Sequence, residues 1–445
     1  MKRFLFTLTL ALVALAGCKK DPAPEPIAGK VSQIKLVGMP TTEFTVGRSV
    51  TISAVITPDD ATDKSVTFTS SNPEVATVEY TESENNYSLA LLKAVGPGKA
   101  TITATANDGS GVKAEAEVTV IPNKTTFTSP ANCYIVTEAG TYAFKTVKGN
   151  SSESVRNIAS AAVLWESFGT DHRPSVGDLV KDVSYKDGEI TFTATSIEGN
   201  AVIAAKDASG KILWSWHIWL TDQPKEHVYK DNAGTMMDRN LGATSAEPGA
   251  VVALGLLYQW GRKDPFLGSS SISSNTIAES TITWPSRVNS NSTNGTIAYA
   301  IANPTTFIAY DKSNYDWYYT GDSSTDNTRW TESESSKSIY DPCPSGWRVP
   351  DAGIWSKAGF YDTTYDGTNE GISFSISSPS KTWYPASGGR SNGDGGLINV
   401  GNGGGYWSAS PRGERAYFLD IDDYGYVETD YNFRALGFSV RCIKD

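Results

Sequence analysis

Histidine is almost absent from this chain of 445 residues, which contains only His172, His217 and His227. None of them lies at a metal-binding spacing or near a cysteine pair, so the sequence predicts no zinc site. A Gly-x-Ser-x-Gly string occurs at 389–393, but no histidine follows it to act as the base of a hydrolase. The glycines at 401–405 are followed by neither a helix nor a lysine, as a phosphate-binding loop requires. The sequence therefore predicts no catalytic residue, no metal ligand and no cofactor.

Positive charge is also scarce. The chain carries 38 Lys and Arg against 49 Asp and Glu, a formal net charge of −11. Nucleic acids and anionic lipid surfaces both require a cationic face to displace their counterions. The charge balance therefore disfavours nucleic acid as a partner, and it disfavours electrostatic attachment to a membrane surface.

Long apolar runs are missing, with one short exception at the N-terminus. Lys2 and Arg3 precede an apolar stretch too short to span a bilayer, which is typical of a cleaved targeting segment. The string Leu15-Ala16-Gly17-Cys18 resembles a bacterial lipobox, which implies a lipoprotein signal peptide at 1–17 and lipidation of Cys18. An ordinary signal peptide is the alternative. Attachment to a membrane is expected only through the acyl chains.

The residues after Cys18 are expected to form a proline-rich tether over 18–30. Cys18-Lys19-Lys20-Asp21 resembles the export signal of surface-displayed lipoproteins of Bacteroidetes. The resemblance implies an outer-membrane, lipid-anchored protein exposed at the cell surface, and the leaflet that carries the anchor stays open.

Residues 31–121 alternate between small polar residues and Val, Ile or Ala. The segment 49–57 follows this period of two, which is typical of half-buried antiparallel strands. Turn residues interrupt the alternation, so a β-sandwich of six or seven short strands is expected. The strings at 68–78 and 94–102 resemble the bacterial Ig-like domain of group 2, although Phe68 stands where that family usually carries Trp. The resemblance implies a spacer or, as an alternative, an adhesive domain.

Residues 122–222 are predicted to form a second all-β module, with a hairpin turn at Asp187-Gly188. Trp214, Trp216 and Trp219 near its end invite a binding interpretation, because tryptophan faces stack on sugars and cations. Alternation places the first two on the face opposite the third, and packing in the core or between domains is the expected use.

Residues 226–445 are rich in Trp, Tyr and Gly. A short helix is expected over 296–302, and another after Pro350, where Asp351 is expected to cap the first backbone amides. The strings at 236–242, 255–266, 340–350 and 437–442 resemble the Fibrobacter succinogenes major paralogous domain, whose members have a C-type-lectin-like fold.

This resemblance implies an α+β C-type-lectin-like domain at 226–445, at the end of a chain that is mainly β. The segment 122–222 is similar to a module that commonly precedes such domains in Bacteroidetes surface proteins. In the lectin-like fold a bridge ties the first helix to the last strand, which implies a disulfide between Cys343 and Cys442. Cys133 is then expected to be a buried free thiol.

Aromatic and guanidinium side chains in the loops of the last domain are of the types enriched at binding hot spots. Trp407 is expected in the core, because it lies in a family motif. The candidate ligand-binding residues are Trp383, Tyr384, Arg390, Arg412, Arg415, Tyr424, Tyr426 and Tyr431.

Carboxylates gather at Asp420, Asp422, Asp423, Glu428 and Asp430, around a glycine-containing turn. Such a group suits calcium or the acid pair of a glycosidase, but solvated turn residues are the expected use. The sugar-site tripeptides of C-type lectins do not occur in this domain, so calcium-dependent sugar binding is not implied.

Together these expectations describe a non-catalytic cell-surface lipoprotein that acts in adhesion, binding a glycan or a surface protein through loops of its last domain. The alternative is a structural or fimbrial-tip component of the cell envelope. A carbohydrate-active enzyme is a third hypothesis, which a carboxylate pair in a cleft would support.

Overall fold

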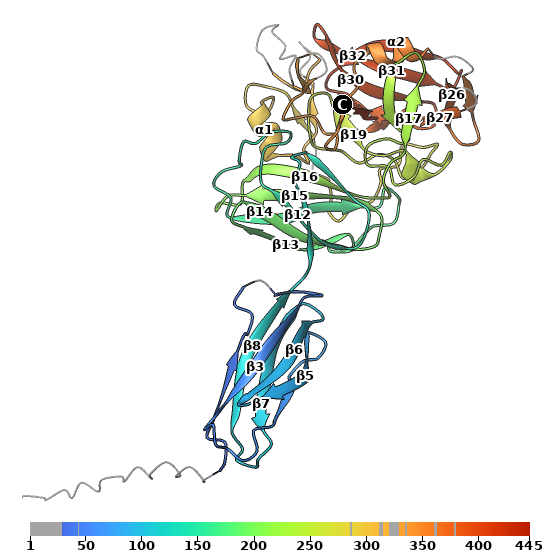
Figure 1. Cartoon of the computed structure of the whole chain (residues 1–445). Coiled ribbons are helices and arrows are strands. Elements are labelled where there is room, and N and C mark those ends of the chain that lie inside the picture. Colours follow the sequence, from blue (N-terminus) through green and yellow to red (C-terminus); the bar gives the residue numbers. More distant parts are fainter. Residues whose placement is uncertain are drawn as a thin grey trace, which may run out of the picture. The chain divides into compact units, whose positions relative to one another are not determined.

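The computed structural model describes residues 29–42, 44–284, 287–310, 315–319, 329–333, 336–359, 363–377 and 380–445. The chain forms two compact units, one ending at Asn123 and the other running from Lys124 to Asp445, and each is treated separately below (Figure 1). Strands hold 47% of the described residues and helices 4%, which confirms the predicted mainly β class. The predicted signal peptide, the lipidation site Cys18 and most of the tether lie outside the described residues.

The first unit is a sandwich of two four-stranded sheets, ordered β1-β3-β6-β5 and β2-β8-β7-β4. Its strands are β1 (Gln33–Val37), β2 (Phe44–Thr45), β3 (Ser49–Thr57), β4 (Val66–Ser70), β5 (Ala76–Glu84), β6 (Tyr87–Ala94), β7 (Gly98–Ala106) and β8 (Lys113–Ile121).

Alternation along these strands builds the core of the first unit. In β3, the predicted strand at 49–57, Ile52, Ala54 and Ile56 are buried, while the residues between them are partly exposed. Phe68 packs in the same core cluster, so an aromatic ring fills this position without tryptophan. The predicted β-sandwich is therefore confirmed.

The second unit begins with another pair of sheets, ordered β13-β14-β11-β9 and β10-β16-β15-β12. The turn Asp187-Gly188 joins β13 to β14 with positive φ at both residues, as predicted for a tight hairpin. The strands are β9 (Lys124–Phe127), β10 (Cys133–Val136), β11 (Gly140–Lys145), β12 (Ser160–Ser167), β13 (Val180–Lys186), β14 (Glu189–Ala194), β15 (Gly199–Lys206) and β16 (Ile212–Leu220).

Strand β16 is buried on both faces, which settles the use of its tryptophans. Trp214 and Trp216 lie in the core between the two sheets. Trp219 packs on the other side, in a cluster that contains Cys133 and Trp260. The packing role expected for these rings is confirmed.

The rest of the second unit is built around the sheet β29-β28-β33-β30-β31-β32, with β19 paired to β33, and its described residues form four smaller sheets, β17-β18-β34-β24, β20-β21, β22-β23 and β25-β26-β27. Its strands are β17 (Glu226–Tyr229), β18 (Gly234–Met237), β19 (Leu257–Gln259), β20 (Val288–Asn289), β21 (Ile308–Ala309), β22 (Thr331–Ser333), β23 (Ser336–Lys337), β24 (Trp347–Arg348), β25 (Thr364–Asp366), β26 (Gly371–Ser377), β27 (Ser380–Pro385), β28 (Gly389–Arg390), β29 (Leu397–Ile398), β30 (Gly403–Arg412), β31 (Arg415–Asp422), β32 (Val427–Phe433), β33 (Gly437–Ser439) and β34 (Ile443–Lys444).

Helices are short. α1 (Ile297–Ala302) begins after Thr296, whose hydroxyl accepts a hydrogen bond from Tyr299 N, and Asn303 follows its last residue as predicted. α2 (Gly353–Ala358) starts later than predicted. The expected side-chain cap by Asp351 is wrong, because the backbone carbonyl of Asp351, not its carboxylate, accepts from Ile354 N.

Cys343 and Cys442 form the predicted disulfide across a sequence separation of 99 residues, with their Cα atoms 6.0 Å apart. The loop before β24 is ordered by the buried Asp341, whose carboxylate accepts hydrogen bonds from Cys343 N (2.8 Å) and Val349 N (2.9 Å). Cys133 is buried and free in the same hydrophobic cluster, as expected. Burial raises the pKa of its thiol, which keeps it protonated and unreactive.

Candidate functional site

Three of the predicted ligand-binding residues belong to the interior instead. Trp383 and Tyr384 are buried, and the guanidinium of Arg441 lies 3.6 Å from the centre of the Tyr384 ring. Arg390 is buried and donates to the carbonyl of Leu267 from Nε (3.0 Å) and Nη2 (2.8 Å). The prediction that these three side chains meet a ligand is wrong, because all three are buried inside the fold.

Arg412, Arg415 and Tyr431 come together on one face of the β30–β31–β32 sheet. The register pairs Arg415 with Phe433 and Tyr417 with Tyr431, so alternation turns these four side chains to the same side. Arg412 pairs with Arg415 where β30 turns into β31, and its guanidinium reaches the same face. We call Arg412, Arg415, Tyr417, Tyr431 and Phe433 the strip.

The side chains of the strip are stacked on one another. The guanidinium of Arg412 lies 3.8 Å from the centre of the Tyr431 ring, and that of Arg415 lies 5.4 Å from it. Arg415 also lies 4.7 Å from the ring of Phe433, which stacks on Tyr315 with centroids 4.0 Å apart. These distances are those of cation–π and aromatic pairs, so the strip holds its shape without a ligand.

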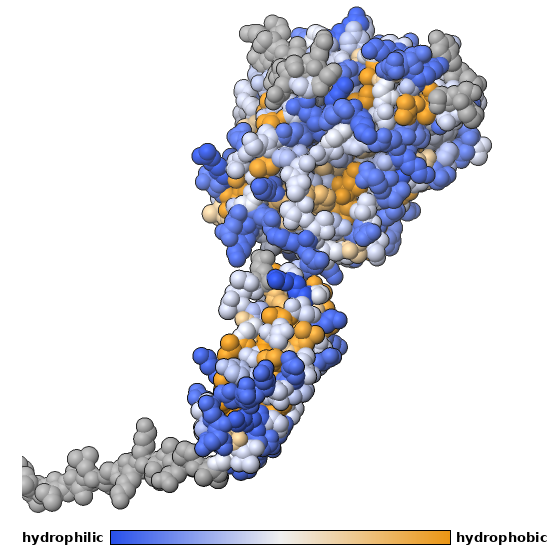
Figure 2. All heavy atoms as spheres, viewed as in Figure 1, coloured by the Kyte–Doolittle hydropathy of each residue, from blue (hydrophilic) through white to orange (hydrophobic). Residues whose placement is uncertain are grey.

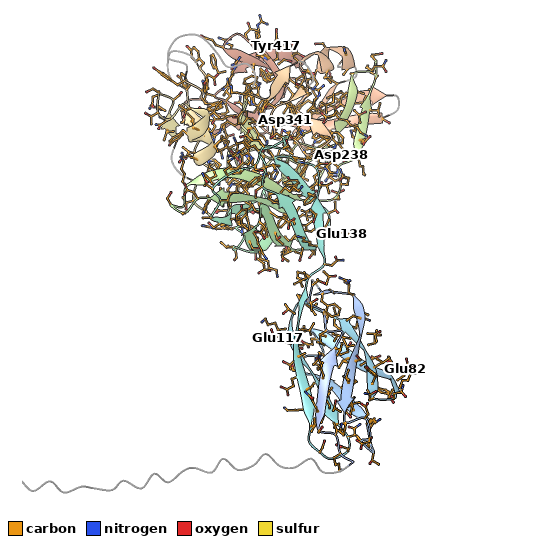
Figure 3. The ribbon with its side chains drawn as sticks, turned by 60° about the vertical axis from the view of Figure 1, so that its left-hand side comes forward. Glu82, Glu117, Glu138, Asp238, Asp341 and Tyr417 are labelled. Carbon is orange, nitrogen blue, oxygen red and sulfur yellow. A yellow bond between two sulfur atoms is a disulfide. The ribbon has the colours of Figure 1, made fainter. Side chains whose placement is uncertain are left out.

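Solvent reaches the strip. Arg412 is exposed, and Arg415, Tyr417, Tyr431 and Phe433 are partly exposed. Figure 3 shows Tyr417 at the periphery of the second unit, while Asp341 lies among its packed side chains. Within the described part of the chain, neither Arg412 nor Arg415 makes an ion pair, and Arg412 Nη1 donates to the hydroxyl of Tyr417 (3.2 Å). The strip therefore offers two guanidinium groups to solvent.

Tyr424 and Tyr426 lie at the other end of the hairpin, in the turn between β31 and β32. They are 84% and 71% exposed, which makes them the most accessible of the predicted tyrosines. The carboxylate of Asp422 accepts hydrogen bonds from both of their backbone amides (3.0 and 2.9 Å), so the turn is ordered although its rings are free of the core. A larger ligand that lies along the hairpin can contact both ends.

The opposite face of the same sheet carries a cleft of about 260 Å³. Phe418 and Phe438 line it with ring centroids 5.0 Å apart, together with Asp420, Asp422 and three asparagines. A Cβ added to Gly405 would lie 2.6 Å from the Phe438 ring, so this close approach requires glycine. The remaining lining residues are Gly388, Gly389, Ile398, Asn399, Asn402, Gly403, Gly404, Ile421, Asn432 and Leu436.

Asp420 is the most perturbed carboxylate of this cleft. Burial, together with the negative charges of Asp430, Asp422 and Glu428, raises its pKa from 3.8 to about 6. None of the described lysine or arginine side chains forms an ion pair with it. The expectation that the acidic residues here are only solvated turn residues is therefore wrong for Asp420, while Asp422 does order the turn.

The strip presents stacked guanidinium groups and aromatic rings to solvent, which are side chains of the types enriched at binding hot spots. The three histidines, all in described parts of the chain, lie outside both the strip and the cleft, and the described residues contain no group of three or more His, Cys, Asp or Glu placed to hold a metal ion.

Figure 2 shows a largely hydrophilic surface on the second unit, with hydrophobic residues in scattered patches on the face in view. Among the described helices, none is long and apolar enough to cross a membrane.

Tyr417 and Phe433 were not among the predicted site residues. Each is separated by one residue from a predicted one, Arg415 and Tyr431 respectively, so the period-two pattern of two adjacent strands contained the signal. Tyr315 carried no such signal, because its contact with Phe433 depends on a loop distant in sequence.

No curated protein matches this sequence. Among solved structures, domains 5 and 6 of the S-layer protein SbsC align with 14% identity and a TM-score of 0.18, over 43% of this chain and 98% of that one. The Yersinia pseudotuberculosis adhesin InvE aligns with 12% identity and a TM-score of 0.21, over 48% and 69%. The SGBP-B protein of the Bacteroides ovatus mixed-linkage glucan utilization locus aligns with 16% identity and a TM-score of 0.14, over 43% and 48%.

At these identities and TM-scores the likeness carries no functional conclusion. The family comparison is more specific, because it matches a defined segment that coincides closely with the first sandwich. Residues 33–126 match the model of the bacterial Ig-like domain (group 2), and this part of the chain is a bacterial Ig-like domain of that group.

Proposed function

We propose that this protein is a non-catalytic cell-surface lipoprotein that binds a glycan or a surface protein through the strip. One observation carries the proposal: two arginines and three aromatic rings form an ordered, solvent-accessible array to which the fold gives no interior use. Arginine and tyrosine, with tryptophan, are the residues enriched at binding hot spots. The Ig-like domain then serves as a spacer between the membrane anchor and the binding unit.

Binding would be tested with the full chain on a glycan array and in pull-downs of surface proteins. The variant Tyr431→Ala removes the ring on which both arginines stack, and it is expected to lose most of the binding signal. Tyr80→Ala is the matched control, because it removes a tyrosine that is 53% exposed on the Ig-like domain. Equal loss in both variants would contradict a role for the strip, and the absence of any ligand would reject the binding function.

Attachment to the outer membrane through Cys18 is part of the same proposal. It is supported by the lipobox resemblance at 15–18. Metabolic labelling with palmitate should mark the wild-type chain and leave the Cys18→Ser variant unlabelled. Labelling of both would show that another residue carries the lipid.

A C-type-lectin-like fold for 226–445 is also proposed. It is supported by the disulfide and by the pairing of an early strand, β18, with the last strand, β34. Both features close a long, loop-rich segment at its ends. An experimental structure in which β18 and β34 do not pair would contradict this assignment.

A carbohydrate-active enzyme is the second candidate function, and the cleft is the observation that favours it. Asp420 stays protonated at higher pH than an ordinary aspartate, as a general acid must. Asp422, its neighbour in the cleft, is already bound by two backbone amides, which leaves it poorly placed as a base or nucleophile. Release of reducing sugar from a polysaccharide that is abolished by Asp420→Asn would favour the enzyme over the binding protein.

A further inference from the structure

The turn between β30 and β31 places two like charges opposite each other. Arg412 pairs with Arg415 across the two-residue turn Gly413-Glu414, and both guanidiniums contact the same ring, that of Tyr431. Like charges directly opposite on neighbouring strands are destabilising. Within the described chain no carboxylate forms an ion pair with either arginine, so none of the described residues relieves the repulsion in this way.

The turn that carries Arg412 and Arg415 is also hydrogen-bonded to a buried side chain. Arg434 is buried and donates hydrogen bonds to the carbonyls of Arg415 (3.1 Å) and Gly413 (2.6 Å), which fixes the turn to the core. The faces of the two exposed guanidiniums lie on aromatic rings, so their N–H edges are the parts left for a partner. An arginine arranged in this way loses little conformational freedom when it binds a planar anion.

The chemistry of the exposed edge defines the ligand. Guanidinium groups only donate hydrogen bonds, and they match a carboxylate or a sulfate with two parallel N–H bonds each. The hydroxyl of Tyr417 accepts a hydrogen bond from Arg412 Nη1 and can itself donate one to a ligand. Since the chain as a whole carries a net charge of −11, non-specific attraction of polyanions is weak, and binding at the strip has to come from these local groups.

The aromatic rings of the strip are stacked on its own arginines and on Tyr315. This stacking favours a polysaccharide over a protein as the partner. A stable protein interface needs about 800 Å² on each side with an apolar centre. The strip presents the N–H edges of its two stacked arginines instead. Such an edge fits a hydrophilic chain with repeated acceptor groups.

We propose that the strip binds an acidic polysaccharide, with a carboxylate or sulfate group held between Arg412 and Arg415. This inference rests on the proposed binding function and names the ligand class for it. The phenol hydroxyls bind neighbouring sugar oxygens, and the negative charge relieves the repulsion between the two arginines.

The test measures binding of the full chain to immobilised polygalacturonate, heparin, dextran and poly-glutamate. We expect binding to at least one of the two acidic polysaccharides, little to dextran, and a clear weakening as salt is raised. Replacing both Arg412→Gln and Arg415→Gln should weaken the interaction about tenfold or more. The matched control is Arg156→Gln, which removes an exposed arginine elsewhere on the same unit and should leave affinity within about twofold.

A second variant separates charge from geometry. Arg412→Lys with Arg415→Lys keeps both charges but loses the planar fork, so intermediate affinity is expected. Equal binding to dextran, unchanged binding by the double glutamine variant, or tighter binding to poly-glutamate would each overturn the acidic-sugar assignment. If the array finds only a neutral glycan or a protein, this inference fails while the proposed binding function stands.

Discussion

Two groups of arginines in the second unit are built alike and placed differently. In the interior, Arg329 and Arg434 lie 4.9 and 4.4 Å from the ring of Trp260. At the surface, Arg412 and Arg415 lie on Tyr431 in the same manner. The interior pair shares the carboxylate of Asp316, whereas the strip has no such partner among the described residues.

The comparison shows what stacking alone can do. An aromatic face orients a guanidinium in either place, but a buried cation also needs a carboxylate and hydrogen-bond acceptors to offset its desolvation. A half-exposed cation does not need them for folding. The lack of a carboxylate partner for the strip among the described residues is therefore compatible with stability, and in the proposed function it leaves the two arginines free to bind a ligand.

The strongest way to break the interior group is Asp316→Asn. The change leaves two buried guanidiniums without their shared negative charge, and we expect a loss of about 3–5 kcal/mol in the free energy of unfolding. Urea unfolding at neutral pH measures it. Glu226→Gln removes an exposed carboxylate from its pair with Lys444 and should cost less than about 1 kcal/mol. Similar costs for the two variants would show that the interior group is not held by charge pairing.

Removal of the disulfide disturbs both groups at once. Cys343→Ala with Cys442→Ala opens a loop with a sequence separation of 99 residues, and we expect a loss of about 2–4 kcal/mol. The urea midpoint and the binding signal should fall together in this variant. An unchanged midpoint would mean that packing alone closes the segment.

The acidic face of the hairpin provides an intermediate test. The pKa of Asp420 is raised from 3.8 to about 6, so the folded protein binds this proton more tightly than the unfolded chain does. The contribution of Asp420 to stability therefore becomes unfavourable as pH rises from about 4 to above 6. Since the side chain is only partly buried, we expect Asp420→Asn to stabilise by about 1 kcal/mol at pH 7.5.

The same Asp420→Asn variant should differ little from the wild type at pH 4, where the aspartate is protonated in the fold. Asp171→Asn, which removes an exposed carboxylate elsewhere on the same unit, is the control for the loss of one negative charge. A stabilisation that is equal at both pH values would indicate a cause other than ionisation.

The smallest effect on stability is expected at the strip itself. Arg412→Gln with Arg415→Gln should change the free energy of unfolding by no more than about 1 kcal/mol, because exposed cation–π contacts contribute little. Urea unfolding of this variant should be measured together with its binding curve. A loss comparable to that of Asp316→Asn would make the two groups equivalent and remove the argument for a binding site.

Local sequence patterns predicted the elements that depend on near neighbours. Strand β3, the hairpin at Asp187-Gly188 and the end of α1 all follow from alternation, turn residues or caps. The exposed residues of the site were found for the same reason: Tyr424 and Tyr426 flank a turn. These predictions required no knowledge of distant contacts.

The sequence could not show which aromatic and cationic residues of the last domain are buried. Arg390 and Arg412 look alike in the sequence, and the carbonyl of Leu267, 123 residues away, makes the first an interior residue. The acidic cleft was missed because it forms only where β30, β31 and β33 pair around Phe438. Long-range pairing decided both outcomes.

The buried thiol of Cys133 can be used to measure how often the second unit unfolds. The residue is 1% exposed, and it lies in the hydrophobic cluster that also contains the two cysteines of the disulfide. A maleimide reagent can reach it only when that cluster opens, so the labelling rate of a single atom reports cooperative opening of residues 124–445 and is silent about the Ig-like domain.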